Sequence, residues 1–205
     1  MSKIKHFIRE SWLLLLCSFC FGLMLAAANA AWSGKAEQNR INKIKNLMSN
    51  LVPDAKNFEP VINVEVDLGK GKKANSEVFE ALSDDGNCIG WSFKVEGSGF
   101  ADKIELIVAV DATFEKMAGY NVLYAIETPG FGDKIRQDFF SNQFKGAPAS
   151  GFELAKTGDS KIIDTRIVAI SGATVSSTAM VNALNNYFKQ IKPALEAKGL
   201  LKNAK

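Results

Sequence analysis

Residues 170–178 read ISGATVSST, a small and polar stretch between two apolar segments. The segment before it, 164–170 (DTRIVAI), predicts a strand. The segment after it has apolar residues at helical spacing, which predicts a helix: Met180, Leu184, Tyr187, Phe188, Ile191 and Leu195. The stretch is therefore predicted to be a strand-to-helix junction with Gly172 in the bend.

Such a junction has two readings. Backbone N–H groups and the helix dipole at a helix N-terminus attract phosphate. Ser, Thr and Gly are also the ordinary residues that begin a helix. Neither GxxxxGK[ST] nor GxGxxG occurs in the chain, so the standard nucleotide-binding loops are absent from the sequence. The residues alone leave an anion site and a simple helix cap both open.

Upstream of the junction, alternating and continuous apolar runs predict the strands of a sheet. A turn at 83–87 (SDDGN) and another at Gly119 separate some of them, and a helix is predicted over 133–144. This pattern predicts an α+β fold with a mainly antiparallel sheet of four or five strands, flanking helices and a single domain over 56–205. The predicted strands are 60–69, 76–82, 88–101, 102–112 and 120–128.

The N-terminal part contains an uncharged run, residues 11–34, that exceeds the roughly 20 residues needed to cross a bilayer. Lys3, Lys5 and Arg9 lie before it, so the positive-inside rule predicts a cytoplasmic N-terminus and an exported main domain. The sequence Ala28-x-Ala30 also fits signal-peptide cleavage. Because the apolar run is longer than the usual apolar core of a signal peptide, a retained membrane anchor is the prediction.

The predicted organisation is a cytoplasmic segment 1–10, a transmembrane anchor 11–34 and a juxtamembrane helix 35–55, followed by the domain. The juxtamembrane helix is predicted from apolar residues at helical spacing and is ended by Pro53. Those apolar residues are Ile41, Ile44, Leu47, Met48 and Leu51.

Composition excludes several reaction classes. The only histidine is His6, before the anchor, so the exported domain lacks the histidine of a Ser-His-Asp or Cys-His enzyme and of a His-rich metal site. Cys17 and Cys20 form a CxxC inside the apolar run, where they are read as small apolar side chains. Cys88 is alone outside that run, so no intrachain disulfide is expected in the domain. The net charge of +3 comes without a dense basic block, and nucleic acid is not indicated.

The junction resembles a known motif. SGATVSS is similar to the flavinylation motif of the FMN-binding domain family, whose threonine carries FMN through a phosphoester bond. Two upstream segments, ETPGFGDKI (127–135) and NQFKG (142–146), are similar to segments of the G subunit of the Rnf electron transport complex and of the C subunit of the sodium-pumping NADH:quinone reductase. With the single anchor, the resemblance covers nearly the whole chain, and the compact length favours the Rnf subunit.

The resemblance implies that FMN is covalently attached to Thr174. It places the loop 127–132 beside the flavin. The residues alone would also allow this loop to be a simple connecting turn with Asp133 as the N-cap of the next helix. Val168 departs from the pattern, because many members have an acidic residue at that position. No catalytic or metal-binding residue is assigned. The implied cofactor-binding residues are Thr174, Ser171, Gly172, Ala173, Ser176, Glu127, Thr128, Gly130 and Gly132.

By the same resemblance, the chain is an electron-carrying subunit of a membrane-bound, ion-translocating ferredoxin:NAD oxidoreductase. Its implied partners are other membrane subunits, including a second flavoprotein and iron–sulfur subunits, and a flavin transferase that attaches the cofactor. The implied location is the cytoplasmic membrane, with the main domain periplasmic or otherwise extracytoplasmic. Two alternatives stay open: another flavinylated extracytoplasmic reductase domain, and a membrane-anchored binding or scaffold domain without flavin.

Overall fold

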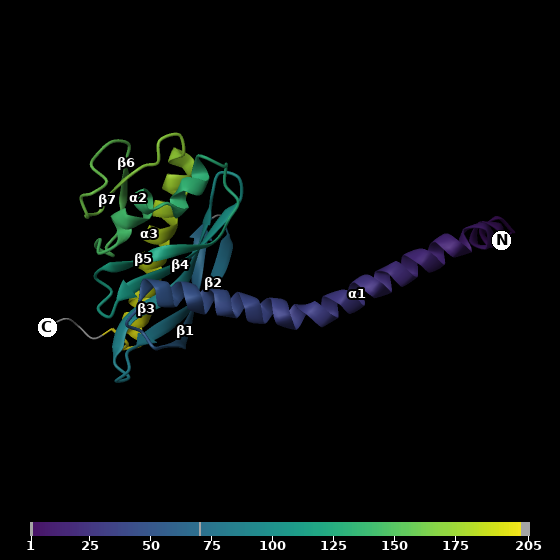
Figure 1. Cartoon of the computed structure of the whole chain (residues 1–205), viewed down its shortest axis with the longest axis horizontal. Coiled ribbons are helices and arrows are strands. Elements are labelled where there is room, and N and C mark those ends of the chain that lie inside the picture. Colours follow the sequence, from purple (N-terminus) through teal and green to yellow (C-terminus); the bar gives the residue numbers. More distant parts are fainter. Residues whose placement is uncertain (1, 70, 202–205) are drawn as a thin grey trace. The chain divides into compact units, whose positions relative to one another are not determined.

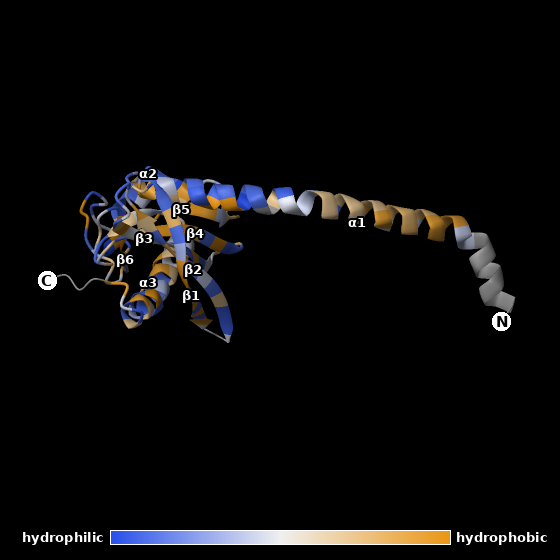
Figure 2. Ribbon diagram, turned by 90° about the horizontal axis from the view of Figure 1, so that it is seen from below, coloured by the Kyte–Doolittle hydropathy of each residue, from blue (hydrophilic) through white to orange (hydrophobic). Residues whose placement is uncertain are grey.

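The computed structural model of the chain describes residues 2–69 and 71–201. It begins with one long helix, α1 (Ser2–Leu51) (Figure 1). Within α1, the segment Ser11–Leu51 contains a stretch that is long and apolar enough to cross a membrane. Figure 2 shows this stretch in orange and the following part of α1 mainly in blue.

The chain divides into two compact units, Met1–Lys43 and Ile44–Lys205. In the first unit, Met1 and the side chains of residues 2–10 lie outside the described part, and the charges that predict the orientation of the anchor are among them. The boundaries predicted at 10, 34 and 55 stay predictions, because α1 is continuous across the first two.

The second unit is built on a five-stranded sheet with the order β1-β2-β3-β4-β5, in which every neighbouring pair is antiparallel. Each strand therefore pairs with the next one in the chain, as in a meander. The predicted α+β class with an antiparallel sheet is confirmed. The strands are β1 (Asn57–Gly69), β2 (Lys72–Leu82), β3 (Cys88–Ser98), β4 (Lys103–Asp111) and β5 (Met117–Ala125).

Both faces of the sheet are covered. The helix α3 (Thr174–Ala197) packs across one face (Figure 1). All six apolar residues of its predicted stripe are buried. On the other face, Met48 from the end of α1 packs with Ile107 and Leu123. The Asn121 side chain also donates a hydrogen bond to the Leu47 carbonyl at 2.9 Å. The sheet thus holds α3 through the buried apolar side of that helix.

The predicted helix over 133–144 is wrong as a single element. The segment forms three short helical pieces, η1 (Gly132–Arg136), α2 (Asp138–Ser141) and η2 (Asn142–Phe144). Gln137 is extended and separates η1 from α2, and η2 follows α2 directly. The Tyr120 hydroxyl donates a 2.5 Å hydrogen bond to the Ile135 carbonyl, which a continuous helix would use internally. Burial raises the pKa of Tyr120 well above its ordinary value, which keeps this hydroxyl protonated as a donor.

Two short strands precede the junction. β6 (Glu153–Ala155) and β7 (Arg166–Val168) pair in parallel, so the strand predicted over 164–170 is present but shorter. The buried Gln143 side chain donates to the Val168 carbonyl at 3.2 Å and accepts from the Val168 N–H at 2.7 Å. Gln143 thus makes the bonds that a neighbouring strand would make and holds the chain just before the junction.

Candidate functional site

The turn between β7 and α3 is fixed by its backbone. The Ala173 N–H donates to the Ile170 carbonyl at 2.9 Å, and Gly172 between them has φ +79°. A Cβ atom at Gly172 would lie only 2.8 Å from Cδ1 of Phe131. The positive φ favours glycine at this position, and the close contact brings the Phe131 ring against the turn.

Ser177 fastens the same turn from inside. Its hydroxyl, fully buried, donates to the Ala173 carbonyl at 3.0 Å and accepts from the Ile170 N–H at 3.0 Å. The end of the strand and the first turn of the helix are therefore joined through one side chain. Ser177 is a structural residue of the junction.

The other hydroxyls of the junction differ in their partners. Ser176 is buried and donates to Glu127 Oε2 at 2.5 Å, and Thr178 Oγ1 donates to the Thr174 carbonyl at 2.7 Å. Thr174 and Ser171 are exposed, and neither side chain hydrogen-bonds to any residue that the structure describes. Of these two, Thr174 is the first residue of α3.

The N-terminus of α3 is an open donor site. The first intrahelical bond runs from the Ser177 N–H to the Ala173 carbonyl at 3.0 Å, so the N–H groups of Thr174, Val175 and Ser176 precede the ladder. No side chain that the structure describes caps the helix, and its first turn has no acidic residue. These N–H groups and the helix dipole favour an anion beside Thr174.

The loop after β5 is a tight turn. The Phe131 N–H donates to the Thr128 carbonyl at 3.2 Å, with Pro129 and Gly130 between them, and Gly130 has φ +76° as in a type II turn. The alternative reading of Asp133 as a helix N-cap is wrong, because η1 begins at Gly132 without any side-chain cap. The loop instead presents Phe131, half exposed, toward the junction.

The carboxylate of Glu127 joins three segments of the site. It accepts hydrogen bonds from the Phe100 N–H at 3.0 Å, from the Ala101 N–H at 3.3 Å and from the Ser176 hydroxyl. A Cβ at Gly132 would lie 2.7 Å from Glu127 Oε2 and 2.6 Å from Ser176 Oγ. Loop, junction and the β3–β4 turn are therefore packed around this side chain.

These segments surround a cleft of about 480 Å³, a size typical of small-molecule sites. It brings the loop and the junction together although they are far apart in the sequence. Of the predicted site residues, Ser171, Glu127 and Gly130 do not line it. The lining residues are Phe100, Thr128, Phe131, Gly132, Gly172, Ala173, Thr174, Val175 and Ser176.

Three apolar residues of the cleft were not among the predicted site residues. Phe100, Phe131 and Val175 are at least half exposed, with exposed fractions of 66%, 50% and 54%. Phe131 lies in the loop 127–132, where the predicted cofactor-binding residues included Gly130 and Gly132 but not Phe131. For Phe100, the sequence shows only a phenylalanine in a glycine-containing turn. No local pattern connects Phe100 to Thr174. Lys134 adds a positive charge nearby, with Nζ 5.9 Å from the centre of the Phe131 ring.

Comparison with known proteins gives similarity over most of the chain. Residues 99–189 match the FMN-binding domain family. The chain is 28% identical to the G subunit of the ion-translocating oxidoreductase complex of Methanosarcina acetivorans, over 91% of this chain and 95% of that protein. It is also 28% identical to the G subunit of the proton-translocating ferredoxin:NAD(+) oxidoreductase complex of Clostridium ljungdahlii, over 87% of this chain and 88% of that protein.

Two solved structures are similar. NqrC of Shewanella oneidensis matches with a TM-score of 0.53 and 25% identity, covering 71% of this chain and 73% of that chain. The C subunit of the Na(+)-translocating NADH-quinone reductase of Parabacteroides distasonis matches with a TM-score of 0.56 and 18% identity, covering 83% and 98%. The second similarity shows a shared fold.

The cleft fits the parts of FMN. The free N–H groups at the start of α3 suit a phosphate, and the exposed rings of Phe100 and Phe131 offer apolar surface to a flat aromatic ring. The close packing at Gly172 and Gly132 leaves main chain, rather than side chains, at the cleft wall. The residues present are therefore compatible with FMN bound so that its phosphate lies beside Thr174.

Proposed function

We propose that this chain, a homologue of the G subunits of Rnf-type ion-translocating oxidoreductase complexes with an FMN-binding domain, carries electrons through FMN attached to Thr174. The observation that supports the attachment is the state of the Thr174 hydroxyl. It is exposed, has no hydrogen bond to any described residue, and lies in the cleft at the first turn of α3. The other hydroxyls of that turn are occupied by protein partners.

The attachment is a transfer reaction that needs FAD and a flavin transferase. Thr174 Oγ1 forms a bond to the phosphorus of the FMN half of FAD, the pyrophosphate P–O bond breaks, and AMP leaves. The hydroxyl proton passes to a base of the transferase. The product is a phosphodiester that keeps one negative charge, and the N–H groups of Val175 and Ser176 are placed to stabilise it.

The chain's own residues hold and tune the cofactor. When bound, FMN would supply the one- and two-electron chemistry. The predicted contact residues Thr128, Gly130 and Gly132 shape the loop, while Phe100 and Phe131 offer apolar surface for the flavin ring. A covalent link suits an exported domain, because a cofactor lost there could not be replaced from the cytoplasmic flavin pool.

The apolar stretch of α1 and the homologues' membrane complexes support membrane anchoring of this chain. We propose that the N-terminus is cytoplasmic and that the domain over 56–205 lies on the extracytoplasmic side. In that place it would receive electrons from a membrane iron–sulfur subunit and pass them to a second flavoprotein subunit. Relatives are named as proton- or Na⁺-translocating, so the coupled ion of the assembly would be one of these two.

The electron-carrying role is tested with the intact complex. We expect the chain, made in cells with a flavin transferase and isolated within its complex, to show flavin absorbance that bleaches when reduced ferredoxin is added and returns with NAD. A matched complex containing Thr174→Val reports which part of the signal belongs to this chain. Flavin on this chain that never changes its redox state would contradict the proposal.

The orientation has its own test. Because the charges before the apolar run predict a cytoplasmic N-terminus, protease added to cells with an opened outer barrier is expected to digest the domain. A cytoplasmic protein in the same cells should stay intact as the control. Digestion only in inverted cytoplasmic-membrane vesicles would show that the orientation is the reverse.

A further inference from the structure

We infer that Glu127 is a positioning residue for cofactor attachment: it acts through Ser176 to hold the first turn of α3, and with it the Thr174 hydroxyl, against the loop 128–132. The resemblance placed Glu127 beside the flavin, but the structure places its carboxylate behind the cleft wall. The inference rests on the proposed attachment of FMN at Thr174.

Burial and charge make this contact strong. Glu127 is only 7% exposed, and its carboxylate meets three donors: the Phe100 N–H, the Ala101 N–H and the Ser176 hydroxyl. An ionised carboxylate accepts all three, and such charge-assisted hydrogen bonds are about twice as strong as neutral ones. The N-terminus of α3 also favours a negative charge close to it.

Residues that the structure describes crowd both oxygens of the carboxylate. A Cβ at Gly99 would lie 2.2 Å from Glu127 Oε1, and a Cβ at Gly132 would lie 2.7 Å from Oε2. The main chain at Gly99 thus lies against one carboxylate oxygen, and the main chain at Gly132 lies against the other. Glu127 is also not among the residues that line the cleft. It is therefore placed to contact a bound flavin through the residues it holds and not directly.

Ser176 transmits the effect to Thr174. It lies in the same helical turn, two residues further along, and its hydroxyl is fixed at 2.5 Å from Glu127 Oε2. This contact sets how far α3 stands from the loop and how its first turn is rotated. Transfer to Thr174 Oγ1 requires a defined approach of the hydroxyl to phosphorus, and a displacement of about 1 Å can cost about a hundredfold in rate.

The test measures flavin transfer to the full-length membrane chain with purified flavin transferase and FAD. Glu127→Gln and Ser176→Ala are each expected to lower kcat about tenfold while KM for the protein substrate stays unchanged. A chain that is merely less stable would contain less folded substrate. Its apparent KM would rise while kcat stayed unchanged, which is the opposite pattern. Because both variants disturb the Glu127–Ser176 contact through which the effect passes, the double variant should be no slower than the slower single variant.

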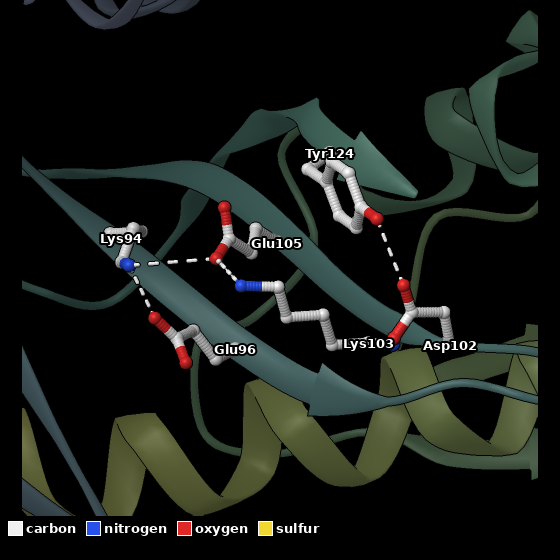
Figure 3. A network of polar contacts seen from close by, with 6 residues as sticks. All are labelled: Lys94, Glu96, Asp102, Lys103, Glu105 and Tyr124. Atoms are coloured by element: carbon white, nitrogen blue, oxygen red, sulfur yellow. Dashed lines mark hydrogen bonds and ion pairs between the residues drawn. The ribbon is translucent and has the colours of Figure 1, made fainter. Parts of the chain in front are cut away.

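Glu105→Gln is the matched control. Glu105 is 8% exposed, nearly as buried as Glu127, but its partners are lysines on the sheet, with Lys103 Nζ at 2.8 Å and Lys94 Nζ at 3.9 Å (Figure 3). It does not line the cleft, so its variant should keep the wild-type kcat in the folded protein. Circular dichroism at the assay temperature identifies the folded variants.

The outcomes separate the two proposals. A wild-type chain that takes no flavin at Thr174 would refute the proposed function. A wild-type chain that is flavinylated, with Glu127→Gln as fast as Glu105→Gln, would refute only the positioning role. If Glu127→Gln does not fold, Ser176→Ala decides, because it removes one hydroxyl from an otherwise unchanged helix. Wild-type kcat in that variant would overturn the inference.

Discussion

A chain with Thr174→Val is expected to fold, insert into the membrane and carry no covalent flavin. Valine nearly preserves the shape of threonine but lacks the oxygen that would bond to phosphorus. Thr174 is exposed and its hydroxyl has no partner among the described residues, so stability should change by less than about 0.5 kcal/mol. Flavin fluorescence on a denaturing gel, from cells that also make a flavin transferase, should fall from a clear band to background.

The matched control is Thr178→Val. Thr178 is also exposed and lies one turn further along α3, but its hydroxyl donates to the Thr174 carbonyl at 2.7 Å. This variant should keep the fluorescent band at wild-type intensity. A band that persists in Thr174→Val, at equal protein level, would show that another hydroxyl is the acceptor.

The second large effect is expected from Gly132→Ala. The added Cβ would lie 2.6 Å from Ser176 Oγ and 2.9 Å from Glu127 Cβ, both closer than real Cβ contacts. Because Ser176 and Glu127 are buried, neither can move away without shifting the loop or the helix. We expect flavin transfer to fall about a hundredfold, with a loss of about 1–3 kcal/mol in the free energy of unfolding.

Gly90→Ala is the control that distinguishes the effect of steric crowding anywhere in the domain from the effect of crowding at the cleft. Its Cβ would lie 2.5 Å from the Val110 carbonyl oxygen, between β3 and β4. This variant should also lose stability, but the folded fraction should accept flavin at the wild-type rate. Both are compared by thermal unfolding and by transfer kinetics below the unfolding transition. Equal transfer rates in folded Gly132→Ala and folded Gly90→Ala would mean that the loop is only a connecting turn.

Local patterns predicted much of this molecule. The antiparallel strands and α3 follow from apolar alternation and helical spacing, and both signals lie within neighbouring residues. Gly172 in a bend before a helix is equally local, because its φ of +79° suits glycine whatever the tertiary structure. The junction and its exposed Thr174 could therefore be placed from the sequence.

Features that depend on distant partners were missed. The segment 133–144 has helical spacing, but the Tyr120 hydroxyl binds the Ile135 carbonyl and Gln137 is extended, so the helix breaks. Tyr120 comes from β5, and no local pattern shows that its hydroxyl reaches this point. In the same way, Phe100 enters the cleft through the β3–β4 turn. The position of Glu127 behind the cleft depends on three segments packing together.

The central claim is tested most directly by peptide mass mapping of the wild-type chain isolated from cells with a flavin transferase. The account predicts a single peptide carrying the mass of phosphate-linked FMN, with fragment ions that locate it on Thr174. Modification of Ser171, the other exposed hydroxyl of the junction without a partner among the described residues, would contradict the assignment. The absence of any flavin-bearing peptide from a fully covered digest would contradict covalent attachment altogether.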